Sequence, residues 1–159
     1  MTARQWFERA KKEKFAIGAF NVGNLETLEA IVAAVKNKKS PVIIEASSGE
    51  SGFMGYNNLV DIVQNYKDEG AQIILNLDHA TEFDKVKLAF DAGFDYLHFD
   101  GGKIEFEENV KIAKQIVEMA HTKGIMVEGE VDHITGSSGI HAGGVEQEQA
   151  KGDYSDQLS

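Results

Sequence analysis

The residues best suited to catalysis or metal binding are Asp78 and His79, which follow an almost wholly apolar run at residues 73–77. An imidazole can bind a metal ion, and a neighbouring carboxylate can act as a general acid or base. Neighbouring residues of a strand point to opposite sides, but a turn at the strand end can bring both side chains into one cavity. For an isolated pair, a purely structural arrangement, with Asp78 capping a turn and His79 on the surface, is favoured over a functional one.

The pair is part of a wider pattern, because every apolar run that we predict to be a strand ends in polar residues. These residues are Asn21, Ser47, Asp78 with His79, Asp100 and Glu130. In parallel α/β architectures, functional sites form at the carboxyl ends of the strands. A single polar residue in a loop says little, but polar residues at five strand ends, three of them with acids, predict a site along this rim.

Two pairs of residues at a spacing of two favour a bound cation at this site. His98 and Asp100 share one face of their predicted strand, and so do Glu128 and Glu130. Carboxylates on a strand that enters a core are costly unless they are paired, protonated or bound to a cation. The chain has no cysteine, so a metal would be held by His, Asp or Glu.

Other classes of function are weakly supported. With 16 basic and 26 acidic residues the formal charge is -10, which disfavours nucleic acid and anionic membrane surfaces as partners. No Gly-x-Gly-x-x-Gly follows the first predicted strand and no Gly-Lys-Ser/Thr element is present. Lys103, the nearest candidate for a Schiff base, falls in a predicted loop. Without a membrane-spanning apolar run or a secretory signal pattern, the chain is expected to be cytoplasmic.

The elements that must position these residues alternate along the chain. Apolar periodicity predicts strands at residues 15–20, 42–46, 73–77, 96–99 and 125–131, and helices at 3–12, around 28–35, around 59–66, at 81–93 and at 105–123. Pro41 ends the second helix, and Thr81 with Asp84 is read as a capping box that opens the fourth. The last helix is expected to bury Val110, Ala113, Val117 and Ala120.

Five strands joined by helical crossovers predict a parallel sheet with right-handed connections. Two α/β architectures remain open at this point, a doubly wound sheet and part of a (β/α)₈ barrel. A complete barrel needs about 250 residues, more than the 159 of this chain. Residues 132–159 contain no strand-like run and are expected to form a glycine-rich loop and tail.

Five motifs in order along the chain resemble those of one family. They are Ala16-Ile17-Gly18-Ala19-Phe20-Asn21-Val22, Leu77-Asp78-His79, Phe99-Asp100-Gly101, Phe106-Glu107-Glu108-Asn109 and Val127-Glu128-Gly129-Glu130. They are similar to motifs of the class II fructose-bisphosphate and tagatose-bisphosphate aldolases, which are zinc-dependent (β/α)₈ barrels. The resemblance implies a TIM-barrel fold, α/β in class, of which residues 1–159 form one partial domain with the N-terminal five β/α units. Residues 131–159 would be its glycine-rich active-site loop and tail.

The resemblance also implies roles for the rim residues. Asp78 matches the general acid/base that acts on the hydroxyl beside the cleaved carbon–carbon bond, and His79 matches a ligand of the catalytic Zn²⁺. Asp100 and Glu130 match acids of an alternative or second metal position. The implied reaction cleaves a ketose 1,6-bisphosphate, either fructose or tagatose, to dihydroxyacetone phosphate and glyceraldehyde 3-phosphate. Its substrate is a phosphorylated sugar.

Three further residues are nominated by the same resemblance. Asn21 and Ser47 match positions that line the substrate and phosphate pocket. Gly143-Gly144-Val145-Glu146 looks like the element of a mobile loop that carries another proton-transfer acid, which nominates Glu146. Glu45 departs from the family pattern, in which a glutamine is common at this position.

The resemblance further implies that two more zinc histidines and the last three strands would lie beyond Ser159. The chain alone is therefore expected to bind zinc weakly and to show little or no aldol cleavage. Two alternatives stay open: a non-catalytic half-barrel that binds a partner or oligomerises, and a barrel enzyme acting on a different phosphorylated sugar. Unpaired edges on the first and fifth strands make a homo-oligomer expected.

Overall fold

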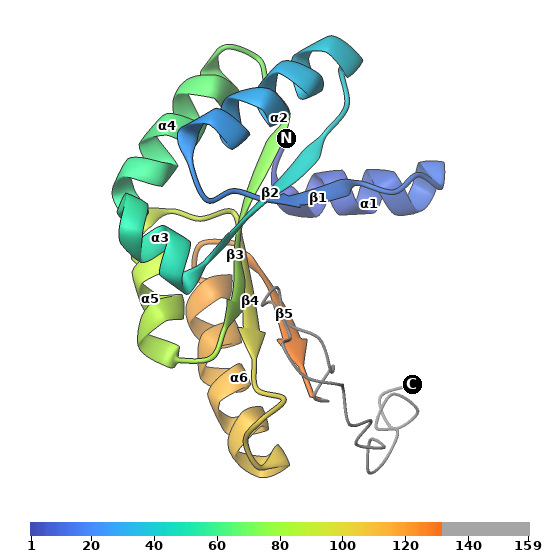
Figure 1. The fold of residues 1–159 in the computed structure, drawn as a ribbon. Helices are drawn as coiled ribbons and strands as arrows, with labels where there is room; N and C mark the ends of the chain where they lie inside the picture. Colours follow the sequence, from blue (N-terminus) through green and yellow to red (C-terminus); the bar gives the residue numbers. More distant parts are fainter. Residues whose placement is uncertain (132–159) are drawn as a thin grey trace, which may run out of the picture.

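The computed structural model of the chain describes residues 1–131, which form one five-stranded sheet (Figure 1). All neighbouring strands are parallel, and their order in the sheet is their order in the sequence. The strands are β1 (Gly18–Asn21), β2 (Val42–Ser47), β3 (Ile73–Ala80), β4 (Tyr96–Asp100) and β5 (Met126–Glu130). Their carboxyl ends therefore meet at one rim, which carries the polar residues singled out from the sequence.

The helices are distributed unequally between the two faces of the sheet (Figure 1). They are α1 (Ala3–Glu13), α2 (Leu25–Lys38), α3 (Ser48–Met54), α4 (Tyr56–Asp68), α5 (Phe83–Ala92) and α6 (Phe106–His121). Helices α2 to α6 pack on one face, around buried residues such as Ile44, Leu75 and Leu97. On the other face, α1 places Trp6 against Ile43 and Ile74. No helix within residues 1–131 is long and apolar enough to cross a membrane.

This arrangement decides between the two architectures that the sequence left open. A doubly wound sheet has crossover helices on both faces and a reversal in its strand order. Here every crossover helix lies on the same face and the order runs from β1 to β5 without a reversal. The chain is therefore an α/β partial barrel, as predicted.

Several element boundaries differ from the predictions. The sequence missed α3, whose capping box joins Ser47 and Glu50. The capping box predicted for α5 is wrong, because β3 continues to Ala80 and the helix begins after Glu82, without a side-chain cap bond. The buried face of α6 agrees with the predicted one at Ala120, which is buried, and at Ala113, which packs against the core. It differs elsewhere, because Asn109 and Ile116 are buried in place of Val110 and Val117.

Both outer strands of the sheet have an open edge in the part of the chain that the structure describes. There, β1 pairs only with β2, and β5 only with β4. All four residues of β1 are exposed, and Phe20 exposes 53% of its surface. The sheet thus has the unpaired edges that the sequence predicted.

Candidate active site

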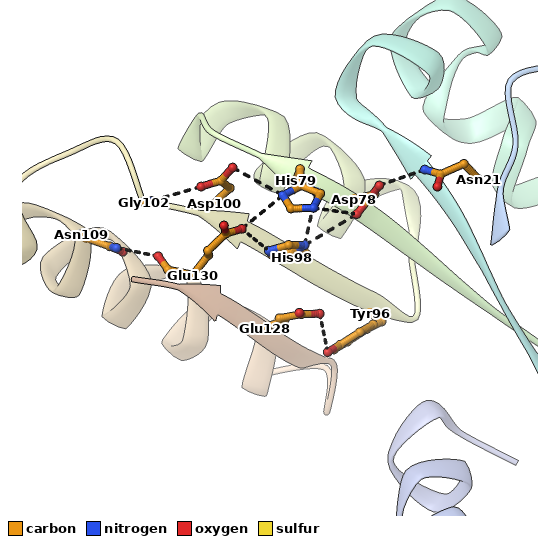
Figure 2. A network of polar contacts seen from close by, with 10 residues as sticks. All are labelled: Asn21, Asp78, His79, Tyr96, His98, Asp100, Gly102, Asn109, Glu128 and Glu130. Atoms are coloured by element: carbon orange, nitrogen blue, oxygen red, sulfur yellow. Dashed lines mark hydrogen bonds and ion pairs between the residues drawn. The ribbon is translucent and has the colours of Figure 1, made fainter. Parts of the chain in front are cut away.

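A β-bulge brings Asp78 and His79 to the same side of the sheet. Between the register pairs Leu77 with Leu97 and Ala80 with Phe99, these two residues of β3 lie opposite one residue of β4. A bulge inserts one extra residue and re-aims the side chains around it. His79 takes up the extra length with a φ of 45°, in the left-handed region. Figure 2 shows both side chains in one polar network, although they are neighbours in a strand.

The imidazole of His79 lies among three carboxylates from three different strands. Its Nδ1 is 3.2 Å from Oε2 of Glu130 and 3.4 Å from Oδ2 of Asp100. Its Nε2 is 3.8 Å from Oδ1 of Asp78. The imidazole is half-exposed, whereas the three carboxylates are largely buried. The two ring nitrogens thus face different acids.

These side chains fit a divalent metal. Two overlapping sets of three have ligand atoms within 4.8 Å of one another: His79 with Asp100 and Glu130, and His79 with Asp78 and His98. Zinc bonds of about 2.0–2.2 Å in a tetrahedral site place ligand atoms roughly 3.3–3.5 Å apart. The contacts of 3.2 and 3.4 Å at Nδ1 of His79 are close to that spacing. Only the first set leaves the Asp78 carboxylate free to move a proton.

The surroundings of Asp78 keep it ionised. Its Oδ2 accepts a 2.9 Å hydrogen bond from Nδ2 of Asn21, and its Oδ1 is 3.7 Å from Nδ1 of His98. The interaction with the His98 imidazole lowers the pKa of Asp78 most, and the Asn21 amide lowers it further, against the effect of burial. At neutral pH this carboxylate can therefore accept a proton.

His98 is the site residue whose role the sequence did not identify. It shares a face with Asp100, as the period of two predicted, and it is only 5% exposed. Its Nε2 lies 3.3 Å from Oε2 of Glu130. Burial alone would lower the pKa of His98, but the interaction with Asp78 and the negative charges of Glu128 and Glu130 raise it overall. The signal in the sequence was this spacing of two from Asp100.

The backbone of Glu130 is held in place by a side chain of α6. The amide Nδ2 of Asn109 donates a 2.8 Å hydrogen bond to the backbone carbonyl of Glu130. Asn109 is buried against Gly101, where an added Cβ would come within 2.2 Å of the amide. On the neighbouring strand, Oδ1 of Asp100 accepts from the backbone N–H of Gly102 at 3.0 Å. Two of the five motifs, at residues 99–101 and 106–109, thus have a positional role next to Asp100 and Glu130.

A second polar row lies one layer further into the sheet. Glu45, Asn76 and Tyr96 are register neighbours, and the Tyr96 hydroxyl donates to Oε2 of Glu128 at 2.9 Å (Figure 2). Burial and the charge of Asp78 raise the pKa of Glu45, while burial and Glu128 raise that of Tyr96. Asn76 is 1% exposed, and its amide nitrogen and oxygen have no hydrogen-bond partner among residues 1–131.

The two remaining nominated residues differ in what the structure says of them. Ser47 is the register partner of Asp78 and so lies at the same rim. Its hydroxyl accepts a 3.2 Å hydrogen bond from the backbone N–H of Glu50, yet a hydroxyl that accepts can still donate its own proton. Glu146 lies outside the described residues.

Comparison with known proteins identifies the family to which this site belongs. The model of the family "Fructose-bisphosphate aldolase class-II" matches residues 1–157. The chain belongs to this aldolase family. Its sequence is 37% identical over 140 residues to a fructose-bisphosphate aldolase of Geobacillus stearothermophilus, an alignment that covers 86% of the chain and 49% of that relative.

Solved structures of aldolases share the fold. The YdjI aldolase of Escherichia coli K12 is similar with a TM-score of 0.72 and 30% identity, over 81% of this chain and 51% of that one. A putative fructose-1,6-bisphosphate aldolase of Coccidioides immitis gives a TM-score of 0.74 and 29% identity, over 80% and 50%. This aldolase-family chain thus spans about half the length of the relatives that it matches.

Proposed function

We propose that this chain acts in a class II ketose-bisphosphate aldolase, a carbon–carbon lyase of sugar metabolism. The reaction would be the reversible cleavage of fructose 1,6-bisphosphate, or its tagatose epimer, to dihydroxyacetone phosphate and glyceraldehyde 3-phosphate. One observation carries the proposal: the bulge sets an ionised Asp78 beside one nitrogen of His79, while Asp100 and Glu130 face the other. The substrate class is that named for the Geobacillus relative.

In this proposal, His79, Asp100 and Glu130 hold the metal, and Zn²⁺ is the ion that we assign to this donor set. When bound, the metal supplies a Lewis acid that polarises a carbonyl oxygen and offsets the negative charge that develops on cleavage. Asp78 takes the proton from the hydroxyl beside the breaking carbon–carbon bond and returns it in the reverse reaction. Asn21, through its 2.9 Å hydrogen bond, orients the carboxylate for this transfer.

Substrate contacts are assigned at the same rim. Asn21 is exposed next to Asp78, and Ser47 lies one strand away, so both are placed to bind hydroxyl or phosphate oxygens of the sugar. We assign Glu146 a second proton-transfer role on sequence grounds alone. We also propose that the protein is cytoplasmic, which agrees with a substrate from sugar metabolism.

A second candidate function is favoured by the open edges of the sheet. A five-strand half-barrel in which β1 and β5 each have an edge unpaired by residues 1–131 can associate with a second copy or another protein through strand pairing. In that case the chain would be a non-catalytic binding or oligomerisation module. Homo-oligomers are expected under either function.

The experiment that tests the proposal measures release of dihydroxyacetone phosphate from fructose 1,6-bisphosphate by the 159-residue chain with Zn²⁺. Because the chain spans about half of its relatives, we expect cleavage more than about tenfold below that of the Geobacillus enzyme. Asp78→Asn should reduce the residual rate a further 10²- to 10⁴-fold, a range of the order expected for loss of an acid/base group. Asp61→Asn, at an exposed position of α4, is the matched control.

Three outcomes are informative. Zinc-dependent cleavage that is lost in Asp78→Asn and kept in Asp61→Asn supports the aldolase. A rate within tenfold of the relative would contradict the expected need for further β/α units. A chain that neither cleaves the sugar nor binds metal, but that self-associates, supports the oligomerisation module instead.

A further inference from the structure

His98 is the residue of β4 that lies opposite the two-residue bulge, and the function proposed above assigns it no task. Its side chain is only 7% exposed, so protein groups surround both ring nitrogens. The ring centroids of His98 and His79 are 4.3 Å apart (Figure 2). The imidazole of His98 therefore packs directly beneath the proposed metal ligand.

The contacts of His98 link the bulge on β3 to the carboxylate on β5. Its Nδ1 lies 3.4 Å from the backbone nitrogen of His79, placed to accept that N–H. Its Nε2 lies 3.3 Å from Oε2 of Glu130. In the neutral ring with its proton on Nε2, His98 accepts from the bulge and donates to Glu130 at the same time, and its Nδ1 also lies 3.7 Å from Oδ1 of Asp78. The distance between the bulge and Glu130 is thus set by a planar, rigid imidazole ring.

We propose that His98 is a positioning residue that holds the left-handed backbone of His79 and the carboxylate of Glu130 in their relative placement. The proposal deepens the function given above and rests on it for the metal ion that His79 and Glu130 would bind. Partners that hydrogen bond to metal ligands typically change metal affinity by about 10- to 100-fold when they are replaced. Loss of the His98 ring should therefore weaken metal binding although the ring itself is not a ligand.

Two conservative substitutions separate the two contacts. An asparagine oxygen can reach the position of Nδ1, so His98→Asn keeps an acceptor for the His79 N–H and loses the donor to Glu130. A glutamine amide can reach the position of Nε2, so His98→Gln does the reverse. His98→Leu fills similar space and loses both contacts.

The first measurement needs no metal. Amide hydrogen exchange at His79, followed by NMR on the 159-residue chain, should speed up about tenfold in His98→Leu and His98→Gln and stay near the wild-type rate in His98→Asn. The Leu97 amide in the middle of β4 is the reference, and its rate should change little in any variant. Unchanged exchange at His79 in His98→Leu would overturn the proposal.

The second measurement is a Co²⁺ titration followed by visible absorption. Each variant should bind Co²⁺ roughly 10- to 100-fold more weakly, with the absorption bands of the bound ion at unchanged wavelengths. Shifted bands in His98→Gln would show direct coordination and overturn a positioning role, as would wild-type affinity in His98→Leu. If the wild-type chain binds no Co²⁺ but the exchange pattern is as expected, the positioning role stands and the proposed metal-dependent function fails.

Discussion

His79 combines a side chain that faces two carboxylates with a backbone in the left-handed region. Its side chain faces the carboxylates of Asp100 and Glu130, while its backbone adopts a φ of 45° that L-residues with a Cβ disfavour by about 1–2 kcal/mol. The sequence pointed to Asp78 and His79 because they follow an apolar strand. It could not show the bulge, because Leu-Asp-His-Ala contains no glycine that would mark one inside a strand. The convergence of both side chains is therefore a product of tertiary structure.

The strained backbone of His79 predicts that glycine is more stable than alanine at this position, the reverse of the usual order in a strand. In a regular strand, glycine is about 0.5–1 kcal/mol less stable than alanine. At His79 we expect the opposite, with His79→Gly more stable than His79→Ala by roughly 1 kcal/mol, since glycine has no Cβ to clash. Urea denaturation measures the free energy of unfolding. Glu128 is the control, because it is exposed on β5 and has no positive φ, so Glu128→Gly should be less stable than Glu128→Ala. If glycine were also less stable than alanine at His79, the left-handed geometry would be contradicted.

Glu45 gives a prediction with a defined dependence on pH. Burial and the charge of Asp78 raise its pKa above the ordinary value. Such a carboxyl binds its proton more tightly in the folded chain, so its ionisation destabilises the fold as pH rises through that raised pKa. Glu45→Gln should be more stable than wild type at pH 7–8, and the difference should fade as pH drops below the ordinary pKa of about 4.3. Denaturation at a series of pH values measures this difference.

The control for Glu45 is Glu8→Gln, at an exposed position of α1, where the difference from wild type should vary little with pH. A Glu45→Gln variant that is less stable than wild type at pH 8 would show that the charged carboxylate has a stabilising partner.

At the scale of elements, the sequence predicted most of what holds the site. The alternation of strands and helices and the polar strand ends followed from local periodicity, but the right-handed crossovers left the strand order open between a doubly wound sheet and part of a barrel. Helix α3 was missed because Ser47 to Gly52 is rich in serine and glycine, although Ser47 and Glu50 are spaced as a capping box. The burial of Asn109 was missed because polar side chains are expected on the solvent face of a helix.

The packing of α6 against the turn after β4 predicts that Gly101 tolerates no side chain. A Cβ at Gly101 would lie 2.2 Å from the Asn109 amide, so Gly101→Ala should lower the free energy of unfolding by about 1–3 kcal/mol. Gly129→Ala, on the strand that carries Glu130, is the matched control: its Cβ would meet nothing within 4 Å and should change stability by less than about 0.5 kcal/mol.

The Gly101 effect should be coupled to Asn109. In a double-mutant cycle, Gly101→Ala should cost much less in the Asn109→Ala background, where the clashing amide is gone. Additive costs would mean that Gly101 is needed for a reason other than this contact.

At the scale of the whole molecule, residues 1–131 form a five-stranded sheet that has two open edges within this range and carries the candidate site on its rim. The chain spans about half the length of its relatives, which have the same fold over the matched region. The order of the strands is continuous, so β1 and β5 are the places where further strands or another chain can pair. The sequence predicted these edges but says nothing of what covers them.

The open edge of β1 predicts self-association. Phe20, 53% exposed on β1, adds an apolar side chain to an unpaired strand. Phe20→Lys should shift the chain toward monomer in sedimentation velocity, with the dissociation constant raised about tenfold or more. Leu88→Lys is the control, because Leu88 is 48% exposed on α5, a helix that packs on the central strands β3 and β4. An equal effect of both substitutions would point to general surface hydrophobicity.

In the proposed function, the bulge at Asp78 and His79 builds a metal site with the acids of β4 and β5. Anomalous diffraction at the zinc absorption edge, on crystals of the 159-residue chain grown with Zn²⁺, would locate the ion. We predict one strong peak between Nδ1 of His79 and the carboxylates of Asp100 and Glu130, and no peak at this position in His79→Ala. A wild-type crystal without a peak there, or with its zinc held only elsewhere, would contradict the claim.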